Sequence, residues 1–490
     1  MLRELPELRE DAAALASGLC RERYRRAAGL PALQSLRELL RAHKLAASAE
    51  GTAQAREALS NAEGEDPRRP GRIVRLRWLL AFLARTRALA LEPGAAQELF
   101  ALAQRPLVRP PGDAGLHGAI PPVALERNLP AERAREKRAE LEAALAAALQ
   151  PADGARSASW DAAMTARSEA GLRVPDGAAE WSEKVLGGTD AVLSDLGFWL
   201  LERHTGAKPG SAARHDVLHL LHAPRCAGAF PAGEMQRAVR RWAEMLRLEF
   251  EGVKIDDEDR PLKHPGAHAE PIDPPWEVAL TFLPQEGPWA LSRLLAALGI
   301  ALLRTGPPPD APPEDLWFGD PAVAHACAAL LEGLVRDREW LRRCAKVELA
   351  RDDERAIAIA AVIDARLAAA RTLAALQAHE SGLGSKAAAA HRDLFVRATG
   401  AELPAGLALC DLDPWLGGFA ELQGRALAAR IVAFLRERYD EDWWRNPRTA
   451  ASLNGLWARG GRPTCAELWT ELGGEPAVDP LVFDLSQGCR

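Results

Sequence analysis

Residues 215 to 222 read HDVLHLLH and place two histidines four positions apart. His215 and His219 would lie one turn apart on the same helix face, as in the zinc-binding sequence HExxH. Asp216 stands where that sequence has its glutamate and would be the general base that activates a zinc-bound water. Glu244 follows His219 by 25 positions and would supply the third ligand. These four residues are one candidate zinc site.

Three features of the sequence argue against zinc at this position. Aspartate is one methylene shorter than glutamate, so its carboxylate reaches a metal-bound water less easily. The stretch lies between a loop and Pro224, which predicts a helix of only about three turns. The chain has 68 Asp and Glu in 490 residues, so a carboxylate falls at any given spacing often by chance. The spacing of Glu244 from His219 is therefore weak evidence for a third ligand. The alternative is a short surface helix with Val217, Leu218 and Leu221 facing the core, and with the histidines and Arg214 facing water.

The composition is typical of a soluble globular protein, with 48% hydrophobic and 27% charged residues. The net charge is −6 and there is no long Lys/Arg run, so neither nucleic acid nor a membrane surface is indicated as a partner. The N-terminal stretch alternates in charge and lacks an apolar signal core, and the ten-residue apolar run from Leu294 to Leu303 is too short for a bilayer. Seven scattered cysteines without a CxxC pair predict reduced thiols and a cytoplasmic location.

The periodicity of apolar residues predicts a mostly α-helical chain. Ala, Leu, Arg and Glu dominate, and apolar residues recur at three- and four-residue steps. The clearest helical stretches are 72–104, 131–149, 187–204, 321–379 and 421–438. Stretches rich in Pro and Gly predict loops at 105–122, 305–315 and 401–414.

The segment from Leu246 to Leu283 departs from the helical pattern. Alternation in LRLEFEGVKI and EVALTFL predicts two or more short strands and therefore one small antiparallel sheet. A helix from Leu291 to Arg304 is predicted directly after a Pro/Gly turn. The elements therefore indicate a helical body with one small sheet and a strand-then-helix unit at 277–304.

Several segments after residue 180 resemble, in their order and spacing, the thimet oligopeptidase/oligoendopeptidase family of zinc metallopeptidases, and most closely a bacterial branch of it. The segments are RHDVLHLLHAPRCAGAFPAGEM (214–235), the strand pair at 260–287, FGDPAVAHACAALLEGLVRDREWLRR (318–343), and two C-terminal stretches at 394–431 and 440–473. The resemblance implies a helical, zincin-type (neurolysin/thimet-like) fold with a central cleft, and it gives segment 214–235 a structural role. It also implies a catalytic lobe at 181–490 and, by fold analogy, a helical N-terminal lobe at 1–180.

The resemblance places the family's HExxH on the helix after the second strand, where this chain reads AALGI. Ala296 and Ile300 take the positions of the two zinc-binding histidines, Ala297 that of the catalytic glutamate, and Gly299 keeps a glycine often found in the motif. The third-ligand glutamate, 25 residues after Ile300, corresponds to His325, for which we expect a satisfied core or cleft position. Catalytic zinc needs three protein ligands, so one histidine does not suffice. The stretch 413–427 also lacks the His and Tyr that the family carries there.

The resemblance and these losses together imply a catalytically inactive metallopeptidase homologue, a pseudopeptidase, without zinc or another cofactor. We expect its cleft to bind a peptide or a protein partner such as an active paralogue. Candidate cleft-lining residues are Asp411, Asp413, Gln423 and Arg425, for which helix capping and surface solvation are the alternative. Two other functions stay open: an active zinc metallopeptidase that cleaves short peptides through the HDxxH site, and a purely structural or interaction protein whose cleft has filled.

Overall fold

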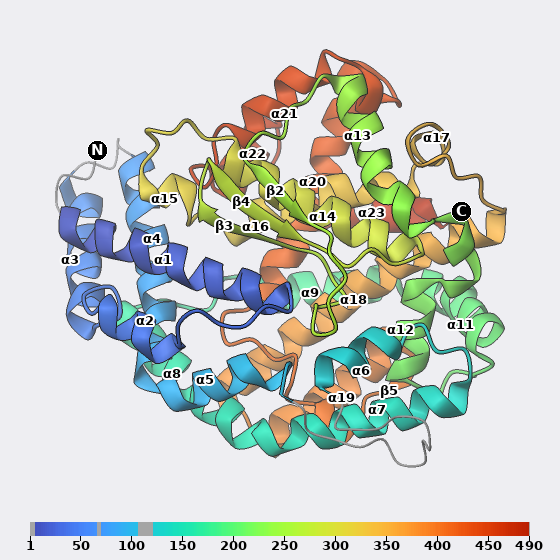
Figure 1. The fold of residues 1–490 in the computed structure, drawn as a ribbon, viewed down its shortest axis with the longest axis horizontal. Coiled ribbons are helices and arrows are strands. Elements are labelled where there is room, and N and C mark those ends of the chain that lie inside the picture. The colour runs from blue at the N-terminus through green and yellow to red at the C-terminus, as the bar shows by residue number, and fades with distance from the viewer. Residues whose placement is uncertain (1–4, 66–69, 106–120, 490) are drawn as a thin grey trace.

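The computed structural model in Figure 1 describes residues 5–65, 70–105 and 121–489. The predicted loop at 105–122 lies almost entirely outside these residues. Within them the chain is mostly helical, with two small sheets, so the predicted fold class is confirmed. None of the described helices combines the length and apolarity that a bilayer span requires.

The first eight helices cover the N-terminal part of the chain. They are α1 (Pro6–Ala27), α2 (Leu36–Ala42), α3 (Ala49–Glu65), α4 (Pro70–Leu91), α5 (Pro93–Leu102), α6 (Pro122–Asn128), α7 (Arg135–Leu149) and α8 (Asp153–Ala170). The predicted helix 72–104 is two helices because Pro93 starts a new one, in the first turn, where its missing N–H is not needed. Leu8, Leu15 and Leu83 form a core of their own with Phe318 from the second half of the chain.

The remaining helices extend to the C-terminus, and α14 among them packs against the larger sheet. They are α9 (Ala178–Gly188), α10 (Asp190–Val192), α11 (Phe198–Thr205), α12 (Arg214–His222), α13 (Met235–Leu246), α14 (Pro288–Thr305), α15 (Pro313–Leu316), α16 (Pro321–Glu332), α17 (Arg338–Trp340), α18 (Arg351–Ser381), α19 (Ser385–Thr399), α20 (Gly417–Tyr439), α21 (Thr449–Trp457), α22 (Cys465–Glu471) and α23 (Asp479–Gly488). The predicted helix 321–379 is interrupted because the short 3-10 turn η5 (Gly333–Arg336) follows α16 and Lys346 has a left-handed conformation.

The larger sheet has three strands in the order β2–β4–β3. They are β2 (Val253–Asp256), β3 (His268–Asp273) and β4 (Glu277–Thr281). The prediction of an antiparallel sheet is right for β3 and β4 and wrong for β2, which runs parallel to β4. The alternation that begins at Leu246 does not produce a long strand, because α13 continues to that residue and Arg247 ends it in a left-handed conformation. A second, two-residue pairing joins β1 (Ala212–Ala213) to β5 (Ala401–Glu402).

Helix α1 links the N-terminal part of the chain to this sheet and to α15. Helix α1 lies along β3 (Figure 1), and the Ser17 hydroxyl donates a hydrogen bond to the carbonyl of Ile272 at 2.7 Å. Arg9 forms an ion pair with the buried Glu314 at 2.6 Å. The division into lobes at residue 180 remains a prediction.

Helix α16 lies between α14 and α20 at backbone contact. A β-carbon built on Gly299 of α14 would lie 2.1 Å from the Cys327 carbonyl oxygen. One built on Gly424 of α20 would lie 2.4 Å from the β-carbon of His325. Real β-carbons do not approach other atoms this closely, so glycine at these two positions lets the three helices pack together.

Candidate functional site

Of the three histidines of HDVLHLLH, all on α12, the two candidate zinc ligands are buried, at 4% exposure for His215 and 5% for His219. The expectation that they face water is therefore wrong. The Nδ1 of His219 donates to the carbonyl oxygen of Pro130 at 2.8 Å, and that of His222 donates to Leu218 at 2.9 Å. These contacts make the histidines part of the packing between α12 and its neighbours.

The Asp216 carboxylate is fully buried and is engaged in several ion pairs and hydrogen bonds. It forms ion pairs with Arg135 at 3.1 Å and Arg138 at 3.0 Å, and accepts the backbone N–H of Ala213 at 3.1 Å. Burial alone would raise the pKa of Asp216, but the hydrogen bonds from His215, Arg135 and Arg138 outweigh it and hold the pKa well below its usual range. The carboxylate fixes the first turn of α12 and is not free to act as a general base.

The third residue of this candidate zinc site does not join the other two. Glu244 is exposed on α13. Within the described ranges, no three His, Cys, Asp or Glu side chains form a group that would hold a metal ion. His215, His219 and Glu244 are therefore not brought together as zinc ligands, because their side chains are used in packing or face solvent.

The positions at which the resemblance places the zinc site lie on α14 and α16. Ala297 is buried, and Ala296 and Ile300 are half-buried. His325 is half-buried against Gly424. Burial lowers the pKa of His325; Glu421 opposes this lowering, and the positive charge of Arg425 adds to it. Three of these four side chains have no atom that binds a metal, so the residues present do not fit zinc.

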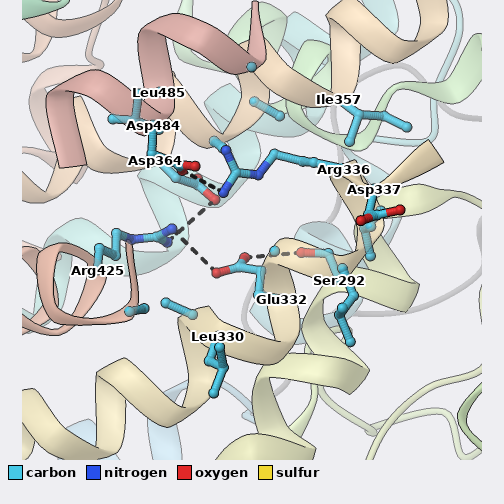
Figure 2. Close-up of a pocket in the computed structure, with 18 of the residues that line it drawn as sticks. Ser292, Leu330, Glu332, Arg336, Asp337, Ile357, Asp364, Arg425, Asp484 and Leu485 are labelled. Atoms are coloured by element: carbon cyan, nitrogen blue, oxygen red, sulfur yellow. Dashed lines mark hydrogen bonds and ion pairs between the residues drawn. The ribbon is translucent and has the colours of Figure 1, made fainter. Parts of the chain in front are cut away.

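Next to these positions, four charged side chains from four helices form a closed ring, called here the charge ring. Its members are Arg293 of α14, Glu332 of α16, Asp364 of α18 and Arg425 of α20. Arg425 contacts Glu332 at 3.3 Å and Asp364 at 4.0 Å; Arg293 contacts Asp364 at 3.2 Å and also pairs with Glu332. Figure 2 shows Arg425, Glu332 and Asp364 pointing toward one another. Each charge in the ring has two neighbours of opposite sign.

A further carboxylate, Glu421, lies next to the Arg425 side of the ring. Glu421 forms ion pairs with Arg425 at 2.9 Å and with Arg371 at 3.2 Å. Burial would raise the pKa of Glu421, but these two arginines outweigh it and lower the pKa to about 2. Burial would lower the pKa of Arg425, but Glu421 and Asp364 outweigh it and raise the pKa.

A cavity of about 330 Å³ opens beside the charge ring, between α14, α16, α18, α20 and α23 (Figure 2). Its lining includes all four ring members. Of the residues expected in the cleft, Arg425 lines this cavity, and Asp411, Asp413 and Gln423 do not. Asp413 instead accepts backbone N–H groups from Trp415 at 3.0 Å and Gly417 at 2.8 Å, and so caps the start of α20.

Arg293, Glu332 and Asp364 were not among the residues singled out from the sequence. A signal for two of them exists. Arg293 precedes Ala296 by three positions and Glu332 follows His325 by seven, so each shares a helix face with a position at which the resemblance places a zinc residue.

Comparison with known proteins supports the architecture. No family model matches the sequence, and no curated protein does. Solved structures match over nearly the whole chain. Trypanosoma cruzi metallocarboxypeptidase 1 shares 12% identity at a TM-score of 0.56, covering 99% of each chain. PZ peptidase A with an inhibitor shares 13% at a TM-score of 0.63, covering 90% of this chain and 84% of that one. Pyrococcus furiosus carboxypeptidase shares 12% at 0.58, covering 100% and 99%.

The chain has the helical, zincin-like metallopeptidase fold. Coverage of 99% includes the N-terminal 180 residues, which the sequence connected to the fold only by analogy. The neighbours include carboxypeptidases as well as the oligopeptidase type that the sequence resembles. At 11–15% identity, this likeness concerns the fold alone.

Proposed function

We propose that this protein is a non-hydrolysing relative of the zinc metallopeptidases that uses its cleft to bind a peptide or a protein partner. The observation that carries the proposal is the set of side chains at 296, 297 and 300, which offers only methyl and aliphatic groups where zinc and its general base would be needed. An active paralogue as partner and a cytoplasmic location belong to the same proposal.

The charge ring supports this proposal because it occupies the neighbourhood of the lost site. Arg293 lies one helical turn before Ala296, and its contacts tie α14 to α16 and α18. A structural zinc site contributes about 10–16 kcal/mol, and a partly exposed ion pair contributes at most about 1 kcal/mol. The ring therefore orients the four helices more than it stabilises them, and the apolar faces of α14 and α16 supply most of the stability.

The cavity supports ligand binding over the alternative of a filled cleft. A protein with a purely structural role would gain stability by packing the space beside α14, because each cavity costs contacts. Here about 330 Å³ stays open and carries charged side chains. The active-peptidase alternative has no comparable support, because His219 and Asp216 of the HDxxH segment are already bonded to Pro130, Arg135 and Arg138.

The test is elemental mass spectrometry for zinc, in protein purified without a metal-affinity tag, together with hydrolysis of short fluorogenic peptides. The His215→Ala/His219→Ala variant is measured in parallel. We expect less than about a tenth of an equivalent of zinc in both proteins and no chelator-sensitive cleavage. Near one equivalent of zinc that the variant loses, or cleavage that a chelator abolishes, would contradict the proposal.

A further inference from the structure

The cavity beside the charge ring is small and has a defined lining. Its volume of about 330 Å³ lies at the lower end of the roughly 300–1,000 Å³ of ligand pockets. A long peptide or a folded segment does not fit this volume. A ligand that fills the cavity is a small molecule or the end of a chain.

The charges in the lining balance each other. Among the described residues that line the cavity, four are arginines and four are carboxylates: Arg293, Arg336, Arg425, Arg436, Glu332, Asp337, Asp364 and Asp484. A lone anion or a lone cation would gain from one half of this set and be repelled by the other half. The lining therefore favours a ligand that carries one charge of each sign.

One ion pair in the lining lies outside the charge ring and is easier for a ligand to reach than the Arg425–Glu332 pair of the ring. Arg336, at the end of η5, and Asp484 of α23 meet at 2.8 Å with side chains 26% and 33% exposed. The Arg425–Glu332 pair of the ring is only 11% and 15% exposed. The Arg293–Asp364 pair of the ring is comparably exposed, at 28% and 23%. Figure 2 shows Arg336 and Asp484 meeting beside Asp364, so an ammonium group placed there would have two carboxylates in reach.

Apart from Ser292 and Gln487, the rest of the lining is apolar. Leu330, Ile357 and Leu485 line the cavity together with Trp289 and Val432. These side chains come from five helices and form a wall against which an aliphatic or aromatic group would be shielded from water. The cavity thus places the Arg336–Asp484 ion pair beside an apolar wall.

We propose that this cavity binds a small zwitterion of the amino-acid class with apolar side chains, either a free amino acid or a dipeptide. The carboxylate of the ligand pairs with Arg336, its ammonium group with Asp484 and Asp364, and its side chain packs on the apolar wall. The inference rests on the proposed function and narrows its ligand from peptides in general to their smallest members.

The test is isothermal titration calorimetry of the full chain with leucine, with Leu-Leu, and with N-acetyl-Leu-Leu-amide, which has the same apolar groups but no charge. Inorganic phosphate serves as the anion probe. We expect saturable binding of leucine or Leu-Leu, and at least tenfold weaker binding of the blocked dipeptide and of phosphate. Equal binding of the blocked dipeptide, or no saturable binding of either zwitterion, would overturn the inference.

Three variants locate the site. Arg336→Met and Asp484→Asn remove one charge each, and Ala429→Phe fills the cavity and leaves its charges in place. Each should weaken binding at least tenfold.

Arg342→Met is the matched control, because its pair with Glu339 at 2.7 Å is exposed and does not line the cavity. Circular dichroism and thermal unfolding confirm that the variants fold, and if Arg336→Met does not, Ala429→Phe alone decides the site. Unchanged affinity in a folded Ala429→Phe variant would contradict the cavity as the site.

The two proposals fail in different ways. Hydrolysis of Leu-Leu or stoichiometric zinc would contradict the proposed function. A protein without zinc or hydrolysis that binds longer peptides but neither leucine nor Leu-Leu would contradict the zwitterion site alone.

Discussion

The α-carbon of Gly299 lies so close to Cys327 that a β-carbon built on it would stand 2.1 Å from the Cys327 carbonyl oxygen. The neighbouring atoms belong to the backbone of α16, which cannot turn aside as a flexible side chain would. The resemblance explains this glycine as part of a zinc-binding sequence. The packing explains it without a metal, because any larger residue would push α14 away from α16.

Gly299→Ala should therefore destabilise the protein by a net of about 1–2 kcal/mol, since overpacking a core costs about 1–3 kcal/mol and contact with backbone places this case at the upper end. The better helix propensity of alanine offsets only about 1 kcal/mol of this. Gly455→Ala in α21 is the control, because a β-carbon there meets nothing within 4 Å. Urea unfolding of both variants measures the effect. A neutral Gly299→Ala would contradict the close packing.

The charge ring predicts strong coupling between its members. Glu332→Gln leaves Arg293 and Arg425 with one carboxylate fewer and should cost about 1–3 kcal/mol, because a half-buried charge loses its partner. Arg425→Met should cost a similar amount, and the double variant clearly less than the sum of the two. A double-mutant cycle by urea unfolding measures this coupling. Additive effects would contradict a connected ring. The exposed Arg342–Glu339 pair, treated in the same way, should show no measurable coupling.

The pair of His264 and His268 predicts a loss of stability in mild acid. The Nε2 of His268 lies 2.8 Å from the Nδ1 of His264. Burial, with the charge of Arg26, lowers the pKa of His264 to about 4, and burial, with His264 and Arg26, lowers that of His268 to about 3. In the unfolded chain both pKa values are about 6.5. The unfolded state thus binds more protons between pH 6.5 and about 4, and the free energy of unfolding falls as the pH falls through this range.

The measurement is urea unfolding at several pH values from 7 to 4, with His268→Asn beside the parent. The variant should have the smaller slope, because it lacks one of the two histidines that resist protonation. NMR titration of the imidazole protons should show neither ring becoming charged above about pH 5. An unchanged slope in the variant would contradict the assignment.

The register in which the resemblance places a zinc site at 296, 300 and 325 can be tested by building a site there. Ala296→His and Ile300→His, with the native His325, would give three imidazoles, enough for a zinc site with one open position. The double variant should bind one equivalent of zinc, and Ala296→His alone at least tenfold more weakly. Competition with a chromophoric chelator measures both affinities. A folded double variant that binds no zinc would show that these three positions do not converge.

The helical pattern gave the fold class correctly because periodicity is a local property of α14, α18 and α20. Contacts between distant segments were harder to foresee. Neither interpretation of HDVLHLLH, as a zinc site or as a surface helix, includes the buried ion pairs of Asp216, because nothing in the segment indicates Arg135 and Arg138, about 80 positions earlier, as its partners. The parallel pairing of β2 with β4 depends likewise on the path of the chain between them, which alternation does not encode.

Most of the residues that line the cavity could not be predicted from the sequence either. Its charged residues come from several elements that are distant in sequence, and of them only Arg425 is among the residues singled out from the sequence. Arg336 and Asp484 are 148 positions apart and have no shared pattern. Glu332, by contrast, could have been found by following the His325 face of α16 for two further turns.

The backbone contact of α16 with α14 and α20 has a consequence for mutational drift. If no metal has to be held there, as we propose, the half-buried positions 296 and 300 can accept other side chains. Positions 299 and 424 gain no such freedom, because the carbonyl of Cys327 and the β-carbon of His325 fill the space beside them. Under the proposed function, positions 296 and 300 would therefore be open to change, whereas the glycine at 299 would be retained for packing alone.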